Sequence, residues 1–533
     1  MLRDCSRNDP YWTAVKNSVT NNQTRNKMEY PTGIRGLLPK SLVLAAVSLG
    51  FTAESDAQWR MSSLKASPDA PNILWITTDQ QRWDTIHSLG NPHVHTPNID
   101  RLVKEGVSFT RAYVQSPVCT PSRASFLTGK YTSHLRSSKN GQAYWSEASP
   151  LISTVLDDAG YDAGLAGKFH LSTAMANQPE RRPENDGYRM FWFSHSPYQG
   201  GSSNDYIRWH LERGVDIIAL KNELGYVPSE YHETTWNTDR AIDFIREDRG
   251  GSFPWLFSLN IYDPHNPFDA PAEYLERYNI DELPLPRFSP DDIRQKSVFN
   301  DVMFQSVPQV YSDDEARLHL AEYWAQIDHI DVHIGRLLET LEQTGQLDNT
   351  LIIFTSDHGD MVGDHGMRLK GCRFYEGLVR VPLIFWYPGV IEQNLQSDAL
   401  VELVDLFPTV MELTGLPVPG NLHGKSLLPI LNGEADPSHH KDFVRSEFYD
   451  TIETGPGHLH NFGTMIRTER YKLSIYHGHP EGGELFDLEK DPNEFNNLWH
   501  SKKHRDIRYE LMHKAFDQTI FSIDTGPERL GRY

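Results

Sequence analysis

The sequence predicts an α/β protein with a large mixed, mostly parallel sheet sandwiched by helices and a smaller C-terminal α+β domain containing an antiparallel sheet. Two observations carry this prediction. Between residues 71 and 432, short apolar runs alternate with helical patterns, which is typical of parallel strands joined by helices. Within residues 433–533, the segments 463–476 and 483–488 alternate like antiparallel strands before a helical stretch around 507–516. A chain of 533 residues can bury a substantial core in this arrangement.

The individual elements follow from local patterns. Residues 72–78 are apolar and β-branched, so they predict a buried first strand. A helix is expected from Pro97, with Thr96 as its N-cap and Gly106 as its stop. The longest helix is predicted from Ser312 to Gly345, because Ser312 and Glu315 match a capping box and apolar residues keep a helical period. Further strands are expected at residues 351–356 and 381–386.

The N-terminal region has the pattern of a secretory signal. Arg35 and Lys40 precede an apolar run at residues 42–53, and a small-x-small sequence ends at Ala57. We therefore expect an extension and signal peptide at residues 1–57, a linker at 58–70, and a secreted or periplasmic protein. The run is too short to span a bilayer, so no stable membrane insertion is expected; a buried helix is the alternative. Because residues 1–27 are polar, Met28 is a more natural start than Met1.

Charge and cysteine content narrow the class of protein. The formal net charge of -21 argues against nucleic-acid binding, since no basic surplus exists to neutralise phosphates. An anionic substrate would need a local basic pocket. Three cysteines cannot form a disulfide framework, so the fold must depend on packing.

Four strand-like runs each end in polar residues. They are followed by Asp79-Gln80, by Lys168 and His170, by Asp263-Pro264-His265, and by Asp357-His358. Because ligands bind at the carboxyl ends of the strands in open parallel sheets, we expect these distant segments to meet in one place. A single such carboxylate could equally cap a helix or a turn. Four strand ends together favour a functional site.

The chemistry at this edge combines cation ligands with positive charge. Oxygen and nitrogen donors that suit Ca²⁺ or Mg²⁺ come from Asp79, Gln80, Asp357 and His358. Positive charge for an anion comes from Arg123, Lys168, His170, His265 and Lys370. A divalent cation beside basic groups can hold a tetrahedral oxyanion and stabilise its developing charge.

Cys119 is expected at the beginning of a helix, because Pro121 is followed by the helical segment 122–127. The amide groups and dipole of such a terminus favour an anion. An unmodified thiol there could be a nucleophile of low pKa, so a cysteine enzyme stays open from these residues alone. The neighbouring cation ligands favour metal-assisted attack.

The segment Cys119-Thr120-Pro121-Ser122-Arg123, continuing to Gly129, resembles the signature of type I sulfatases in the alkaline phosphatase superfamily. Together with the strand-end motifs, the resemblance covers residues 71 to about 498. Within the family, the chain resembles secreted bacterial polysaccharide sulfatases. It implies an alkaline phosphatase-like catalytic domain at residues 71–432 and a sulfuric ester hydrolase. It also implies that a formylglycine-generating enzyme oxidises Cys119 to formylglycine (3-oxoalanine), whose hydrate attacks sulfur.

The resemblance also implies residue roles. The metal ligands would be Asp79, Gln80, modified Cys119, Asp357 and His358, with Asp357 also accepting a proton. Arg123 and Lys168 would hold the hydrated aldehyde, and His170 would take its remaining proton. Lys370 and His265 would grip sulfate and help the alcohol depart.

Two positions depart from the commonest arylsulfatase pattern: Gln80 stands where a second Asp is usual, and His358 where Asn is common. Both variants resemble the branch with choline sulfatases and phosphonate monoester hydrolases, so Mn²⁺ joins Ca²⁺ and Mg²⁺ as a possible metal. A phosphonate monoester or phosphodiester hydrolase with the same centre stays open. So does a non-catalytic sulfated-glycan binder in which Cys119 is unmodified.

A sulfated oligosaccharide or polysaccharide is the expected substrate, because the chain carries a secretion signal and an aromatic segment at residues 188–206 whose rings could stack on sugars. His329 and His333 are four apart on a predicted helix, but Ile330 stands where a zincin has its catalytic Glu. These two histidines are therefore predicted to have no metal role.

Overall fold

The computed structural model describes residues 65–523 except 68, 146–148, 174–178, 251–252 and 453–461. The extension and signal peptide predicted at residues 1–57 lie outside the described residues, as does most of the linker. The described residues belong to one compact unit. Within the described part of the chain, no helix is both long and apolar enough to cross a membrane.

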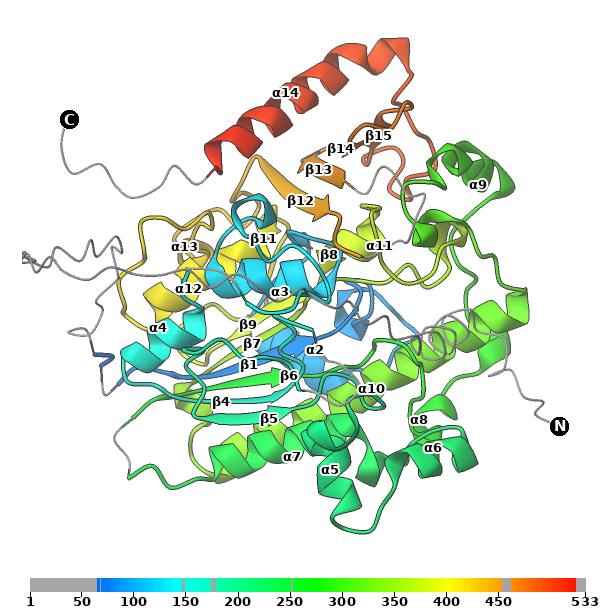
Figure 1. Cartoon of the computed structure of the whole chain (residues 1–533). Helices are drawn as coiled ribbons and strands as arrows, with labels where there is room; N and C mark the ends of the chain where they lie inside the picture. The colour runs from blue at the N-terminus through cyan, green and yellow to red at the C-terminus, as the bar shows by residue number, and fades with distance from the viewer. Residues whose placement is uncertain are drawn as a thin grey trace, which may run out of the picture. The chain divides into compact units, whose positions relative to one another are not determined.

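A central sheet of eight strands organises this unit (Figure 1), in the order β10-β2-β9-β7-β1-β6-β4-β5. The five strands from β7 to β5 are mutually parallel, whereas β9 runs antiparallel to both of its neighbours. The mixed, mostly parallel sheet predicted from the sequence is therefore confirmed. The strands are β1 (Asn72–Thr78), β2 (Val107–Phe109), β4 (Asp162–Gly167), β5 (Met190–Phe193), β6 (Trp255–Asn260), β7 (Thr350–Ser356), β9 (Leu383–Trp386) and β10 (Leu395–Ser397).

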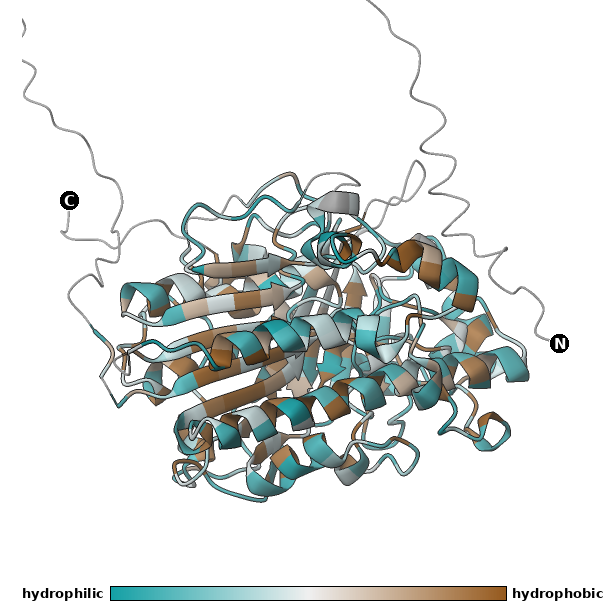
Figure 2. Ribbon diagram, turned by 90° about the horizontal axis from the view of Figure 1, so that it is seen from below, coloured by the Kyte–Doolittle hydropathy of each residue, from teal (hydrophilic) through white to brown (hydrophobic). Residues whose placement is uncertain are grey.

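Helices cover both faces of the central sheet. Alternate residues of β1 point to opposite faces, so Ile73 and Trp75 join one apolar cluster while Leu74 and Ile76 join another. One face is covered by α3 (Cys119–Thr128), α4 (Ile152–Asp158), α12 (Leu406–Leu413) and α13 (Leu428–Leu431), and the other by α2 (Pro97–Glu105), α7 (Glu233–Ile245) and α10 (Asp313–Gln343). Figure 2 shows the strands mostly brown and the covering helices with brown and teal residues, as expected for amphipathic elements.

Local signals placed most of these elements correctly, with two corrections. The capping box of Ser312 and Glu315 is present, and α10 begins at the next residue. The helix α2 begins at Pro97 as predicted, but the Thr96 side chain makes no capping hydrogen bond; it accepts one from the His87 amide instead. The strand predicted at residues 381–386 is two strands, β8 (Arg380–Val381) and β9, because Pro382 has no N–H for the ladder.

The C-terminal region forms an antiparallel sheet of β12 (Phe443–Tyr449), β13 (Phe462–Thr468), β14 (Tyr471–Tyr476) and β15 (Gly483–Asp487). The helix α14 (Arg505–Phe521) packs on it through Leu511, which joins Ile466 and Leu485 in one apolar cluster. We propose that residues 433–533 are a subdomain of the compact unit. The remaining elements are β3 (Ala112–Tyr113), β11 (Val401–Glu402), α5 (Asp205–Leu211), α6 (Ile217–Leu224), α8 (Ala272–Leu275), α9 (Pro290–Lys296) and α11 (Glu376–Val379).

Candidate active site

The polar strand ends do meet at one edge of the sheet. The strands β7, β1, β6 and β4 are neighbours, and Thr78 lies opposite Ser356 at the ends of β1 and β7. Asp79 and Asp357, the residues that follow these two strands, are therefore brought side by side. Gly167 lies opposite Asn260 in the same way, which places Lys168 at this edge beside β6.

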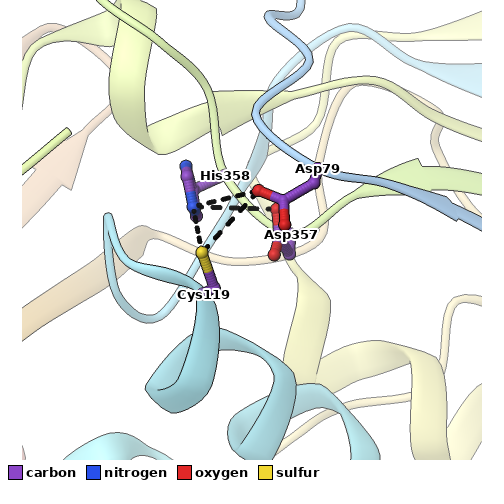
Figure 3. Close-up of side chains that lie close together, drawn as sticks. All are labelled: Asp79, Cys119, Asp357 and His358. Carbon is purple, nitrogen blue, oxygen red and sulfur yellow. Dashed lines mark hydrogen bonds and ion pairs between the residues drawn. The ribbon is translucent and has the colours of Figure 1, made fainter. Parts of the chain in front are cut away.

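Cys119 is the first residue of α3, after the N-cap Val118, and its side chain is fully buried. Its Sγ lies 3.1 Å from His358 Nε2 and 3.7 Å from Asp79 Oδ1 (Figure 3). The ammonium of Lys370 lies 2.8 Å from the same sulfur. Burial and Asp79 would raise the pKa of the Cys119 thiol, but Lys168, Lys370 and His358 outweigh them and lower it. The sulfur therefore lies where negative charge is stabilised.

The residues around this sulfur fit a divalent cation. Ligand atoms of Asp79, Cys119, Asp357 and His358 all lie within 4.8 Å of one another and are buried. His358 Nδ1 donates to the Gly359 carbonyl at 2.8 Å, which fixes the ring with its Nε2 facing the cluster.

Gln80 completes the donor set. Its Nε2 donates to Asp360 at 2.6 Å, while its Oε1 is buried without a hydrogen-bond partner among the residues described. A buried amide oxygen of this kind is available as a ligand for a cation. Carboxylate and amide oxygens suit Ca²⁺ or Mg²⁺, and the single imidazole admits Mn²⁺.

Arg123, in the first half of α3, makes contacts with the residues that follow β1, β4 and β7. Its Nε donates to Asp357 Oδ2 at 2.8 Å, and another guanidinium nitrogen lies 3.6 Å from Asp79 Oδ2. A third donates to the Lys168 carbonyl at 2.6 Å. Burial alone would raise the pKa of Asp79, but Lys168, which forms an ion pair with it, and the other cations hold that pKa well below its usual range. The carboxylate stays ionised and able to bind a cation.

Lys370 and His265 form a pair on the open side of the sulfur, where both are half-buried. Lys370 Nζ lies 3.0 Å from His265 Nε2, and His265 Nδ1 donates to the Asn266 carbonyl at 2.6 Å. Burial and Lys370 lower the pKa of His265 well below its usual value, so the imidazole is neutral and accepts from the ammonium. The pKa of Lys370 is raised, because Cys119 and Asp79 outweigh the effect of burial.

His170 is held by its backbone. It has a positive φ of 60°, and its N–H donates to Glu180 at 2.7 Å. Glu180 also accepts from the next two amides, so this one buried carboxylate fixes the whole turn. Burial, His195 and Lys168 lower the pKa of His170 well below its usual value, which keeps the ring neutral.

His195 and Glu180 belong to the site, but no sequence pattern pointed to them. The ring of His195 meets that of His170 edge to face, with centroids 4.3 Å apart. Burial and Lys168 lower the pKa of His195 to about 3. Both residues lie in irregular loops, so no strand-end or helix pattern marks them in the sequence.

Several aromatic residues in and near the segment 188–206 pack within the protein. Tyr188, Phe193 and Tyr206 are buried, and Trp209 lies against an apolar cluster around Tyr206. These three buried rings do not stack on sugars, whereas Phe191, Trp192 and Tyr198 of the same segment are half-buried.

The fold and site together define a class of protein. Hydrolysis of an ester of a tetrahedral oxyanion needs three features that this site has. They are a buried position for a nucleophile at a helix N-terminus, an oxygen-rich group of residues that could bind a cation, and two lysines. The sulfatase family model matches residues 71–416, and the model of the N-sulphoglucosamine sulphohydrolase C-terminal region matches residues 363–520. The chain therefore belongs to the sulfatase family, and it is a sulfuric ester hydrolase.

Individual relatives agree with this family. The arylsulfatase of Clostridium perfringens is 31% identical over 485 residues, covering 86% of this chain and 95% of the relative. The N-acetylglucosamine-6-O-sulfatase of Bacteroides thetaiotaomicron is 26% identical, covering 94% and 92% of the two chains. Among solved structures, the phosphonate monoester hydrolase of Silicibacter pomeroyi matches with a TM-score of 0.74 and 27% identity, covering 86% and 96%.

Proposed function

We propose that this chain removes sulfate from a sulfated oligosaccharide or polysaccharide after a formylglycine-generating enzyme has oxidised Cys119. The observation that carries the proposal is the position of Cys119 Sγ, 2.8 Å from Lys370 and 3.1 Å from His358 in the cation cluster. Because Cys119 is fully buried, we expect the modifying enzyme to act before the chain folds. An oxygen on the modified residue would face the cluster as the sulfur does.

In the first step, one hydroxyl of the hydrated aldehyde attacks sulfur, and the bond from sulfur to the ester oxygen breaks. Asp357 accepts the proton of the attacking hydroxyl. Lys370, which is hydrogen-bonded to the neutral His265, binds the sulfate group. It also donates a proton to the departing alcohol. A bound divalent cation, held by Asp79, Gln80, Asp357 and His358, would supply positive charge for the sulfate oxygens and the nucleophile.

In the second step, the remaining hydroxyl of the hydrate loses its proton, and the bond from carbon to the sulfate oxygen breaks. Sulfate is released and the aldehyde is restored. His170 serves as the proton acceptor, since its buried Nδ1 has no hydrogen-bond partner among the described residues. Lys168, 3.7 Å from the sulfur, and Arg123 hold the hydrate and its ligands in place.

Mass spectrometry of the peptide that contains Cys119 tests the proposal. After co-expression with a formylglycine-generating enzyme, we expect the residue to lose sulfur and two hydrogens and to gain one oxygen. Turnover of a sulfate ester should rise with the modified fraction. Full turnover from unmodified thiol would contradict the mechanism, and tight sulfated-glycan binding by unmodified protein without turnover would favour a binder.

A phosphonate monoester or phosphodiester hydrolase is the second candidate, and the observation that favours it is the presence of Gln80 and His358 among the cation donors. The similarity to the Silicibacter pomeroyi enzyme points the same way. The carbohydrate assignment is supported by the Bacteroides thetaiotaomicron N-acetylglucosamine-6-O-sulfatase, whose similarity extends over 94% of this chain. Secretion or export to the periplasm, expected from the N-terminal sequence, suits such a substrate.

Matched esters separate these two candidates. We expect kcat/KM for a sulfate monoester to exceed that for the corresponding phosphonate monoester by at least about tenfold, or 1.4 kcal/mol. Both esters carry one negative charge, so the physical reason lies in their shape: a sulfate monoester offers three terminal oxygens to Lys370, Lys168 and a cation, whereas a phosphonate monoester offers two and has a carbon substituent in place of the third. Rates on the two esters with the fully modified enzyme provide the measurement. A faster phosphonate reaction would reassign the chain to the second candidate.

Removal of the cation gives a further prediction. Dialysis against a chelator should lower kcat by at least about a hundredfold, because the oxyanion loses its strongest positive partner. Ca²⁺ should restore activity, and Mn²⁺ should replace it in part, because His358 is an imidazole ligand. Rates measured after titration with each metal check this. Unchanged activity in metal-free enzyme, verified by elemental analysis, would contradict it.

A further inference from the structure

The C-terminal helix α14 packs on the antiparallel sheet with one of its sides. Leu511 is buried, and Ile507 and Ala515, one turn before and one turn after it, pack against the same apolar cluster. These three positions are four residues apart, so they lie along one side of the helix. Figure 1 shows α14 outside the antiparallel strands, at the edge of the compact unit. The opposite side of α14 therefore faces away from the sheet.

The side of α14 that faces away from the sheet is also apolar. Tyr509, Phe516 and Ile520 are 56%, 66% and 46% exposed, and Ile523, just after the helix, is 53% exposed. Intervals of seven, four and three residues place these four side chains in one stripe, about half a turn away from Leu511. We call these four residues the outer stripe. A helix that is apolar on both sides is normally covered on both, because apolar surface is more stable out of water.

The outer stripe is large enough for a contact with another protein. With about 200 Å² for a fully exposed side chain of this size, its four residues expose about 400 Å². This area is typical of the largest apolar patch on a monomeric protein, which often has a function. With the flanking residues added, two copies of the stripe would bury about 1,000 Å² in all, the lower limit for a specific interface. The area therefore suits a dimer that forms reversibly.

The charges beside the outer stripe differ in sign between its two flanks. Arg505 lies on one flank, whereas Glu510 and Asp517 lie on the other. In a parallel pair of helices, a residue on one flank faces the residue five positions further along on the opposite flank of the second helix. Arg505 of each copy would then face Glu510 of the other. An antiparallel pair would bring the two acidic flanks together, so the charges favour a parallel pair.

Two other ways to cover the outer stripe agree less well with the sequence around it. Membranes with anionic lipids attract helices whose apolar side is flanked by Lys and Arg, but Glu510 and Asp517 flank this one. The residues after Ile523 include two large apolar side chains, Leu530 and Tyr533, which are too few to cover four. A second copy of the chain supplies an identical stripe with complementary flanks.

We propose that the outer stripe of α14 is a self-association surface, through which two copies of the chain form a parallel pair of helices. Phe516 of one copy would meet Phe516 of the other at the centre of the pair. His513 lies in the same seam and pairs with Asp517 at 3.1 Å. A polar residue in such a seam fixes the register of the two helices and lowers their affinity. The buried sides of the two helices point away from each other, so each antiparallel sheet stays on its own side.

Sedimentation equilibrium of the full chain tests the proposal through the average mass at rising protein concentration. We expect a monomer–dimer equilibrium with a Kd of about 1–100 µM. Phe516→Glu should raise Kd by at least about a hundredfold, because two carboxylates would meet at the centre of the pair. Phe253→Glu is the matched control, since Phe253 is 63% exposed but precedes β6, far from α14 in the chain. Its Kd should equal that of the wild type.

Charge reversal tests the parallel orientation. Arg505→Glu and Glu510→Arg should each raise Kd by about fivefold, because each change sets like charges against one another twice in the pair. The double variant should return to the wild-type Kd, since it restores opposite charges. Within one helix, Arg505 Nε lies 3.2 Å from Asp506, and both side chains are exposed, so this local pair competes little. A double variant as weak as the single ones would contradict the parallel pair.

Several outcomes would overturn the self-association surface. One is a wild-type chain that stays monomeric at all concentrations, and another is a Phe516→Glu dimer as strong as the wild type. If monomeric wild-type protein sediments with vesicles of anionic phospholipid and Phe516→Glu does not, the stripe contacts a membrane. If Leu530→Glu makes a monomeric chain dimerise, the C-terminal tail covers the stripe. Should near-ultraviolet circular dichroism show that Phe516→Glu is unfolded, Tyr509→Glu replaces it, and an unchanged dimer in that variant contradicts the proposal.

Discussion

Cys119→Ala should abolish turnover and leave the folded chain intact. Without a thiol at this position no aldehyde can form, so the attacking group is lost, and we expect kcat to fall by at least about 10⁴-fold. The fold should persist, because the change removes one atom from a small buried side chain and costs about 1 kcal/mol. Initial rates on a sulfate ester and a thermal melt of the same preparation measure both effects.

Cys372→Ala is the matched control. Cys372 is also fully buried, and burial raises the pKa of its thiol, whereas that of Cys119 is lowered by nearby cations. It packs in the apolar cluster around Phe374, so its replacement should change stability slightly and leave kcat within about twofold. Equal activity in the two variants would show that Cys119 is not the catalytic precursor.

Much of the fold was predictable because local patterns and tertiary structure agree. Residues 72–78 are buried on both sides of the sheet, so their continuous apolar run marks β1 over its whole length. The strand β12 was not predicted, since Glu447 and Arg445 interrupt its apolar pattern; in the structure they form an ion pair with each other, and Glu447 also accepts from the distant Ser133 amide. Tertiary partners of this kind are invisible in a linear pattern.

The same distinction applies to the functional residues. Asp79, Lys168 and Asp357 follow recognisable strands, so the strand-end rule brings them together before any coordinates are known. His195 and Glu180 lie in irregular loops, and the conformation of these loops depends on how they pack against the rest of the protein. Beside His333, the neighbours of His329 in the structure include His232 and Asp263, which come from other elements than α10. Spacing within one helix could not reveal them.

Arg123→Leu is expected to have the second largest effect, on stability and activity together. Arg123 is 1% exposed and lies between Asp357 and Asp79, so its removal leaves two buried carboxylates with less compensation. Breaking a buried ion pair from one side costs about 3–5 kcal/mol. We expect the free energy of unfolding to fall by that amount in metal-free protein, as measured by urea denaturation. Activity should fall at least about a hundredfold, because Asp79, Asp357 and Lys168 lose a common anchor.

Arg101→Leu provides the comparison, because Arg101 forms its ion pairs with Glu105 and Glu342 at the surface, with side chains that are 37%, 44% and 47% exposed. Such pairs contribute about 0–1 kcal/mol, so this variant should unfold close to wild type. Added Ca²⁺ should recover more stability in Arg123→Leu than in Arg101→Leu, since the cation replaces part of the lost positive charge beside Asp79 and Asp357. Similar losses in the two variants, with no difference in their response to Ca²⁺, would mean that Arg123 contributes packing and not charge.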